Sequence, residues 1–295
     1  MQGKTEYKIY LFHISSEKAY NKQQNKDIQM KRIEIFLIFA VLSFVFLSSC
    51  VVTLVDMRED SAYLPAGNFH ETYPFTEGGV ISISNRRGDI EITGWEKSGV
   101  DVYAEKMFLV PKTAMVQVFR KGLIPDIDID RFEDYIGIKT ESDPEQKTTG
   151  MVSYSLKVPY AINLDRIRVE EGDVIVSSVY GKTYIELEKG NVTVENYSGT
   201  LTVNVQDGLV DIGLVDVRNE DSIAVSVDRG EIMLHLEEGA QVDIEASVLT
   251  GTIMNEFEAD TPSAENKVSF QLGQGGAVLS LTVSTGDITI KKGSL

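Results

Sequence analysis

Few residues of this chain are of a type that could do chemistry: three histidines, one cysteine and scattered carboxylates. Besides His13 and His70 there is His235, which alternates with aliphatic residues, so we expect it on an exposed strand face rather than at a catalytic centre. Cys50 is the single cysteine, which excludes an intrachain disulfide and a cysteine metal cluster. No nucleophile elbow and no phosphate-binding glycine loop before a helix is present. The sequence therefore predicts no enzyme, no catalytic residue and no cofactor.

A run of alternating aspartates could hold calcium, because calcium binds several carboxylate oxygens close together. On a strand, however, successive side chains of one face lie about 6.8 Å apart, too far for Asp126, Asp128 and Asp130 to reach one ion. We therefore expect an ordinary strand and no metal. A solvated face is likewise the simpler interpretation of four other acidic residues, Asp173, Glu186, Glu188 and Glu195.

Arg87-Gly88-Asp89 spells the tripeptide that some integrins recognise. Three-residue matches are common by chance, and Gly88 already has an explanation as a turn of the repeat described below. The tripeptide alone is therefore weak support for integrin recognition.

Cys50 closes a segment with the features of a bacterial export signal. Residues 1–29 are polar and without periodicity, and we expect them to be absent from the mature protein. The predicted signal peptide, residues 30–49, has basic residues followed by a thirteen-residue apolar run. It ends in Leu47, Ser48 and Ser49 before Cys50, which resembles the lipobox of bacterial lipoproteins. That resemblance implies cleavage before Cys50 and acyl chains, such as palmitate, on the new N-terminus.

An uncleaved transmembrane helix is the alternative, because residues 35–55 carry no charge. Both interpretations leave Lys31 and Arg32 in the cytoplasm and export everything after Asp56. We favour the lipobox, since the one cysteine stands where that motif requires it. Val51 rather than aspartate follows the cysteine, which predicts the outer membrane or the cell surface if two membranes are present.

Net charge limits the partners of the exported part. The chain carries −17 overall, and 21 basic against 41 acidic residues follow Cys50, a balance near −20. The negative electrostatic field of such a charge repels nucleic acid, anionic lipid headgroups and polyuronates. We expect no nucleic acid partner, a membrane contact through the lipid anchor, and a glycan or protein ligand at the cell surface.

A glycine repeat organises most of the exported chain. From Gly172 onward, each glycine has an aliphatic residue three positions before it and another two positions after it, within short alternating strands, whereas Gly88 has Asn85 at the earlier position. Glycine suits the sharp turn between two such strands, because it adopts positive φ readily. One coil cannot bury enough apolar surface alone, so neighbouring coils must stack as a solenoid. The repeat-turn glycines are Gly88, Gly172, Gly190, Gly208, Gly230, Gly251 and Gly286.

Spacing divides the exported chain into a tether, a less regular β-rich capping region and the solenoid repeats, over residues 50–75, 76–160 and 161–295. In the capping region, residues 111–122 fit either a helix or a strand. The long gap before Gly286 predicts an excursion or an additional irregular coil over residues 255–276, where a binding site could lie. Lys291 and Lys292 are expected to protect an exposed sheet edge.

Residues 152–159, VSYSLKVP, together with the Gly-Asp-Val and Gly-Asn-Val coils and the closing stretch 283–290, resemble the bacterial putative-adhesin family. The resemblance covers about residues 76–295. It implies an exported or membrane-anchored protein with parallel β-helix-like repeats, and the family offers no agreed catalytic residues. Related repeat domains are associated with envelope-stress sensing.

We therefore predict an all-β protein, a parallel β-solenoid, and the general bias of parallel connections favours a right-handed one. The 18-residue period would also suit a left-handed helix of three hexapeptides, although the sequence lacks a six-residue aliphatic period. The predicted role is binding, adhesion or envelope organisation without catalysis. Two alternatives remain open. A carbohydrate-active β-helix enzyme would need carboxylates that converge in a cleft, and a sensing or structural partner protein would need an exposed apolar patch.

Overall fold

The computed structural model describes residues 61–111, 125–141, 150–257, 259–263 and 266–293. Within these ranges there are eighteen strands and no helix, so the prediction of an all-β fold is confirmed. In chain order the strands are β1 Ser61–Tyr73, β2 Val80–Arg87, β3 Ile90–Trp95, β4 Val100–Pro111, β5 Asp126–Phe132, β6 Tyr135–Glu141, β7 Gly150–Pro159, β8 Asn163–Glu171, β9 Val174–Ser177, β10 Tyr180–Lys189, β11 Val192–Leu214, β12 Ser222–Leu236, β13 Val242–Thr250, β14 Ile253–Asn255, β15 Ala259–Ser263, β16 Lys267–Leu272, β17 Ala277–Thr285 and β18 Ile288–Lys292.

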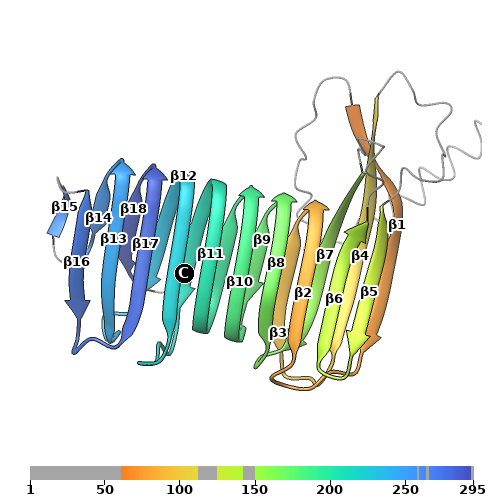
Figure 1. Ribbon diagram of the computed structural model, residues 1–295, viewed down its shortest axis with the longest axis horizontal. Helices are drawn as coiled ribbons and strands as arrows, with labels where there is room; N and C mark the ends of the chain where they lie inside the picture. Colours follow the sequence, from red (N-terminus) through yellow and green to blue (C-terminus); the bar gives the residue numbers. More distant parts are fainter. Residues whose placement is uncertain (1–60, 112–124, 142–149, 258, 264–265, 294–295) are drawn as a thin grey trace, which may run out of the picture. The chain divides into compact units, whose positions relative to one another are not determined.

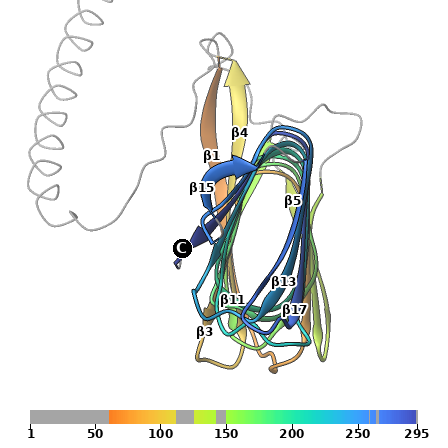
Figure 2. The same ribbon diagram turned by 90° about the vertical axis from the view of Figure 1, so that its left-hand side faces the viewer.

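The strands form two facing layers, here called the front sheet and the back sheet (Figures 1 and 2). The front sheet has the order β5, β6, β2, β8, β10, middle of β11, start of β12, β17, β13 and β16. The back sheet contains β1, β4, β7, β3 and β9, then the start of β11, then the ends of β11 and β12, then β18, β14 and β15. The predicted parallel β-solenoid is therefore confirmed.

One coil consists of a front strand, a glycine turn and a back strand. From β8 to β12 the chain rises along the front sheet, crosses over and returns along the back sheet, which makes a right-handed coil (Figures 1 and 2). The register repeats the sequence period, because Ile185 pairs with Ile167 on one side and with Val203 on the other. All three side chains point inward and are fully buried.

The core is built by the alternation that the sequence shows. Inward residues of β10, such as Ile185 and Leu187, are buried, whereas their neighbours Glu186 and Glu188 face outward. The back strands follow the same rule, and Val192 and Val194 close the coil from the other side. A single continuous core of aliphatic residues therefore runs through the stack.

The order of coils in space differs from their order in the chain at the C-terminal end. The last coil, β17 with β18, pairs with β12 on one side and with β13 and β14 on the other. The prediction that Lys291 and Lys292 protect a sheet edge is therefore wrong, because β18 lies inside the back sheet. Residues 255–276, predicted as an excursion or an additional irregular coil, contain β15 and β16, which flank the coil of β13 and β14 in antiparallel pairing.

The N-terminal end shows a similar inversion and corrects two predicted boundaries. β6 and β7 pair in parallel with β2 and β3, on the side opposite β8 and β9, so the solenoid includes much of the predicted capping region. Residues 61–73, predicted as part of the tether, form β1 and pair with β4 from Ser61 to Tyr73. The side chains of Tyr73 and Phe75 are buried in the core, which ties this segment to the fold.

Candidate functional site

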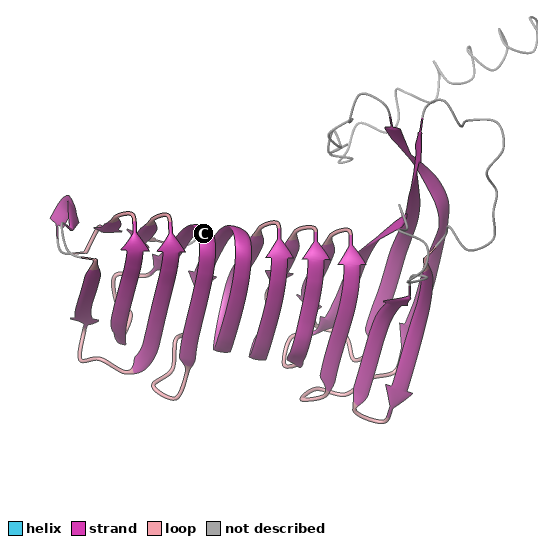
Figure 3. Ribbon diagram, turned by 45° about the horizontal axis from the view of Figure 1, so that its top comes forward, coloured by secondary structure: helices cyan, strands magenta, loops and turns pink. Residues whose placement is uncertain are grey.

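The repeat glycines lie in one line along the turns between the front and back strands (Figure 3). A Cβ at Gly190 would lie 2.0 Å from the carbonyl oxygen of Gly172, and Gly190 has φ +140°. Both the close approach and the positive φ therefore require glycine at this turn. The line continues in spatial rather than chain order, through Gly88, Gly172, Gly190, Gly208, Gly230, Gly286 and Gly251. These glycines form the stacking axis of the solenoid and leave no space for a ligand between coils.

The residue after several of these glycines links one coil to the next. The Asp173 side chain accepts a hydrogen bond from the backbone N–H of Asn191 at 2.7 Å, and the Asn191 side chain accepts one from Leu209 at 3.1 Å. Asp287 accepts the N–H of Thr252 in the same way, at 2.7 Å. Asp173, predicted to belong to a solvated acidic face, therefore satisfies a backbone donor of the neighbouring coil.

The Arg87-Gly88-Asp89 tripeptide makes contacts within the fold. The Arg87 guanidinium donates to the Glu171 carboxylate at 2.7 Å, and Asp89 accepts the backbone N–H of Asp173 at 2.9 Å. Gly88 belongs to the glycine line, with its Cβ position 2.3 Å from the carbonyl oxygen of Val152. Both charged side chains are engaged by the next coil, so nothing in this geometry favours integrin recognition.

Outward residues of the front sheet form a shallow hollow of about 450 Å³, here called the front depression. Its polar side chains form two rows that run across the strands. In the first row, Glu186 of β10 is in register with Asn204 of β11, and Asn204 is in register with Ser226 of β12. The polar residues that line the depression are Arg168, Glu186, Glu188, Asn204, Gln206, Ser226 and Asp228. Four neighbouring strands of the front sheet therefore hold seven polar side chains on one surface.

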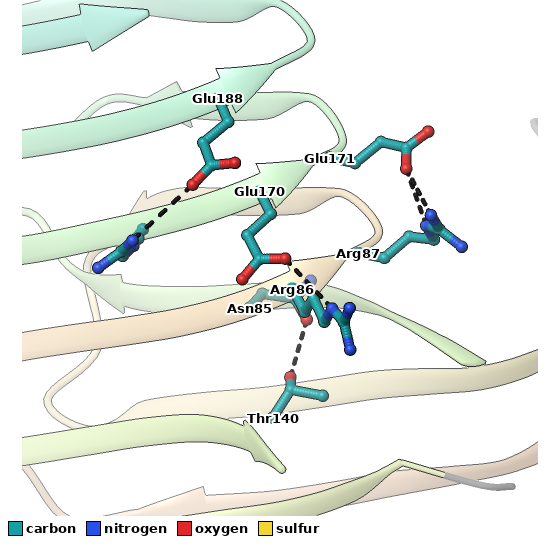
Figure 4. Close-up of polar contacts among 8 residues, drawn as sticks. Asn85, Arg86, Arg87, Thr140, Glu170, Glu171 and Glu188 are labelled. Atoms are coloured by element: carbon teal, nitrogen blue, oxygen red, sulfur yellow. Dashed lines mark hydrogen bonds and ion pairs between the residues drawn. The ribbon is translucent and has the colours of Figure 1, made fainter. Parts of the chain in front are cut away.

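A second hollow, of about 420 Å³, adjoins the front depression and shares Glu188 and Gln206 with it. Ion pairs cross the strands here: Arg86 with Glu170 at 3.2 Å, Arg87 with Glu171 at 2.7 Å and Arg168 with Glu188 at 3.8 Å (Figure 4). Arg229 and Asp207 form another pair nearby. Counted together, the two linings carry four basic and six acidic residues, a balance of −2. The surface therefore disfavours polyanions.

A buried polar network begins at Asn85, the inward residue that replaces an aliphatic one in the coil of β2 and β3. Its side chain donates to the carbonyl oxygens of Gly88 and Val152, at 3.0 and 2.8 Å. The Thr140 hydroxyl lies 2.8 Å from Asn85 Oδ1 and 2.7 Å from the Tyr154 hydroxyl (Figure 4 shows the Asn85 contact). Burial raises the pKa of Tyr154 to about 12. This network is enclosed in the core, so it stabilises the fold rather than a ligand.

His235 is less exposed than predicted, because 13% of its side chain is accessible. Its Nε2 lies 3.1 Å from Oδ1 of Asp211 on the outer face of the back sheet. Gly213 is the register partner of His235 on β11, and its missing side chain leaves room for the imidazole beside Asp211. Among the described residues, the pair belongs to no group of three or more potential metal-binding side chains.

The other predicted sites fall into two groups. Asp126, Asp128 and Asp130 are exposed on β5 as the strand interpretation requires, and no group of three or more potential metal-binding side chains is found in the part of the chain that the structure describes. Leu47, Ser48, Ser49 and Cys50 lie outside the described residues, as do residues 112–122 of the predicted helix or strand. The described ranges hold no helix long and apolar enough to cross a membrane.

The residues of the front depression were not singled out as binding residues by the sequence. A signal for them exists, because Glu186, Asn204 and Ser226 stand at the same outward position of successive coils, 18 and 22 residues apart like the glycines. Glu188, Gln206 and Asp228 repeat that spacing. Polar planar side chains at equivalent outward positions are thus the pattern that marks this surface.

These features define the molecule as a right-handed parallel β-solenoid with a polar ligand-sized hollow on one face. Residues 80–291 match the model of the family described as Toastrack DUF4097, and the chain belongs to this family. The resemblance noted in the sequence to bacterial putative-adhesin proteins is thereby confirmed. No curated protein sequence matches the chain.

Several solved bacterial structures are similar at low identity. A "putative cell adhesion protein" from Clostridium sporogenes is 12% identical, with 77% of this chain and 100% of that one covered and a TM-score of 0.44. A "putative adhesin" from Bacteroides fragilis is 14% identical, with 77% and 97% covered and a TM-score of 0.34. A "putative lipid binding protein" from Parabacteroides distasonis is 9% identical, with 77% and 98% covered and a TM-score of 0.26. No function is carried over from these similarities.

Proposed function

We propose that the protein is an exported, lipid-anchored β-solenoid that binds a glycan or protein ligand at the cell surface. In this proposal it acts in adhesion or envelope organisation and has no catalytic activity. The ligand binds in the front depression, on the side chains that β8, β10, β11 and β12 hold in register.

The observation that carries the proposal is the chemistry of that lining. Amide, carboxylate and guanidinium groups are planar and can donate or accept two hydrogen bonds side by side, which suits neighbouring hydroxyls of a sugar or the groups of a peptide. Gln206, Ser226 and Asp228 add an amide, a hydroxyl and a carboxylate to this lining. A rigid sheet holds these side chains in place before a ligand arrives, which lowers the entropic cost of binding.

The carboxylates of the depression favour binding over catalysis. The Tyr184 hydroxyl donates to Glu186 at 2.6 Å, and Glu188 lies 3.8 Å from the Arg168 guanidinium. A general acid for glycoside hydrolysis is usually kept protonated in an enclosed apolar site. The hollow is instead open and polar, which supports a ligand-binding surface.

The anchor is proposed from Leu47 to Cys50 and the basic residues upstream. Ten residues, 51–60, lie between Cys50 and Ser61, the first residue of β1, so eleven Cα–Cα steps join the two. A chain of that length spans at most about 40 Å. The solenoid would therefore stay close to the bilayer, on the exported side of the outer membrane or at the cell surface.

The test is an array of glycans and host-matrix proteins probed with residues 56–295. The paired substitution Asn204→Ala and Gln206→Ala should reduce binding to any ligand found by at least tenfold, because two hydrogen-bonding side chains are lost. Ser280→Ala is the matched control, since Ser280 faces outward on β17 of the same sheet, outside the depression. A ligand bound equally by both variants would place binding elsewhere, and absence of any ligand would count against an adhesive role.

A further inference from the structure

Each sheet ends in strands that pair on one side only within the described ranges. These terminal strands are β5 and β16 in the front sheet and β1 and β15 in the back sheet. The free backbone donors and acceptors of such a strand can pair with another chain. Natural proteins usually block these edges with charges, prolines or bulges.

Three of the four terminal strands carry such a block. β5 presents three exposed aspartates, Asp126, Asp128 and Asp130. β1 contains Pro65 and a register shift between Pro65 and Gly67. β15 contains Pro262, which has no backbone N–H to donate.

β16 carries none of these devices. It has no proline and no glycine, and its register with β13 is unbroken from Lys267 to Leu272. Lys267 is its one charged residue, and the ammonium group is paired with Glu245 on β13 of the same chain. The edge of β16 is therefore straight, regular and unguarded.

The hydrogen-bonding direction of β16 follows from one bond just beyond its start. The backbone N–H of Val248 donates to the carbonyl oxygen of Asn266 at 2.8 Å, so this pair is a hydrogen-bonded pair. Because residues of an antiparallel strand alternate in direction, Val268 and Phe270 also direct their backbone groups toward β13. The N–H and C=O groups of Lys267, Ser269 and Gln271 then point outward.

The side chains of β16 add an apolar component to this edge. Val268, Phe270 and Leu272 pack against the solenoid core but are only partly buried. A further strand beside β16 would cover them, and each buried apolar area contributes about 25 cal/mol per Å². The edge thus offers backbone pairing and apolar burial together.

We propose that β16 is a dimer interface at which a second copy of this chain pairs antiparallel, with the two-fold axis at Ser269. In this register Ser269 faces Ser269 of the partner subunit, and Lys267 faces Gln271 of the partner subunit. On the inner face, Val268 meets Phe270 of the partner subunit. The outward-pointing groups of the two strands form about six backbone hydrogen bonds.

A second copy fits because β16 is complementary to itself. The two-fold register puts apolar residues opposite apolar residues and places no like charges directly opposite each other. The same operation on β5 would put Asp128 opposite Asp128 and Asp126 opposite Asp130, which like-charge repulsion disfavours. The chain therefore blocks self-pairing at one end of the front sheet and permits it at the other.

The natural absence of other cysteines allows a direct test. In the full chain carrying Cys50→Ser, the substitution Ser269→Cys should yield a disulfide-linked dimer under mild oxidation, since directly opposed strand residues meet the spacing that a disulfide needs. Asp128→Cys on β5 and Ser280→Cys in the middle of the front sheet are the controls and should form no disulfide-linked dimer. Equal cross-linking at Ser269 and Asp128, or none at Ser269, would overturn the proposal.

A second variant separates pairing from folding. Ser269→Pro removes an outward N–H that β13 does not use, so the strand content by circular dichroism should be unchanged. Sedimentation of the full chain in detergent should show a dimer for the natural sequence and half that protein mass for Ser269→Pro. A natural chain that stays monomeric at every concentration, including one that captures a different polypeptide at β16, would refute the second-copy assignment.

Discussion

Gly190 and Gly172 are stacked so closely that a Cβ on Gly190 would lie 2.0 Å from the carbonyl oxygen of Gly172. This contact joins consecutive coils and repeats along the whole stack. Glycine is therefore needed at position 190 for two reasons: the turn requires a positive φ, and the neighbouring coil leaves no space for a Cβ.

Gly190→Ala should therefore destabilise the protein by about 3 kcal/mol or more, because steric overlap adds to the strain of a positive φ. Gly239→Ala is the matched control, since no atom lies within 4 Å of the Cβ position there. Its effect should stay within about 0.5 kcal/mol. Urea unfolding of the two variants measures the difference, and a similar loss for both would contradict the stacking argument.

Asp173→Ala should cost about 1 kcal/mol, because the backbone N–H of Asn191 loses its acceptor. Asp173→Asn should retain most of the stability, since an amide oxygen can accept the same bond, as Asn191 itself does toward Leu209. The free energies of unfolding in urea give the comparison. If asparagine and alanine proved equally damaging, the carboxylate would matter for its charge and not for this hydrogen bond.

Stability should fall at alkaline pH partly through Tyr154. Burial raises the pKa of this phenol from 10.0 to about 12, so the neutral form is favoured in the folded state. The resulting stabilisation is complete below pH 10 and is lost as the pH rises toward 12, by up to about 3 kcal/mol.

Tyr154→Phe should reduce the loss of unfolding free energy between pH 10 and pH 12. Tyr180→Phe, at an exposed ring, should leave that loss unchanged. Urea unfolding at pH 9 and pH 11.5 provides the measurement. An identical alkaline loss in Tyr154→Phe and the natural chain would assign the effect to other groups.

Cys50→Ser should abolish incorporation of radiolabelled palmitate, because the thiol is the proposed site of acylation. Ser49→Cys combined with Cys50→Ser is a control for position, since a cysteine one residue early should be labelled less. Label retained in Cys50→Ser would defeat the proposed anchor.

Local pattern predicted the coils well, because alternation and turn glycines act within about ten residues. Ile185, Leu187 and Val192 could be assigned to the core from their spacing alone. The spatial order of the last coils could not be predicted. Val248 and Val283 occupy equivalent positions, as do Ile253 and Ile288, so either coil presents the same surface to β12.

The polar features were harder to predict because they join residues from different coils. Asp173 was expected on a solvated face, yet its partner Asn191 is eighteen residues away and adjacent only in the folded stack. His235 was expected to be exposed, but its accessibility depends on Gly213 beside it on β11. The front depression likewise exists only when the outward positions of four strands are brought into register.

β17 and β18 lie between β12 and the coil of β13 and β14, and this placement constrains the order in which the coils can assemble during folding. A chain that folds from its N-terminal side cannot form this stack by adding coils in sequence order, since β12 and β13 each keep an open edge until residues 277–292 are in place. The coil of β17 and β18 closes both edges in a single step. Docking of this one coil therefore sets the moment at which the core becomes continuous.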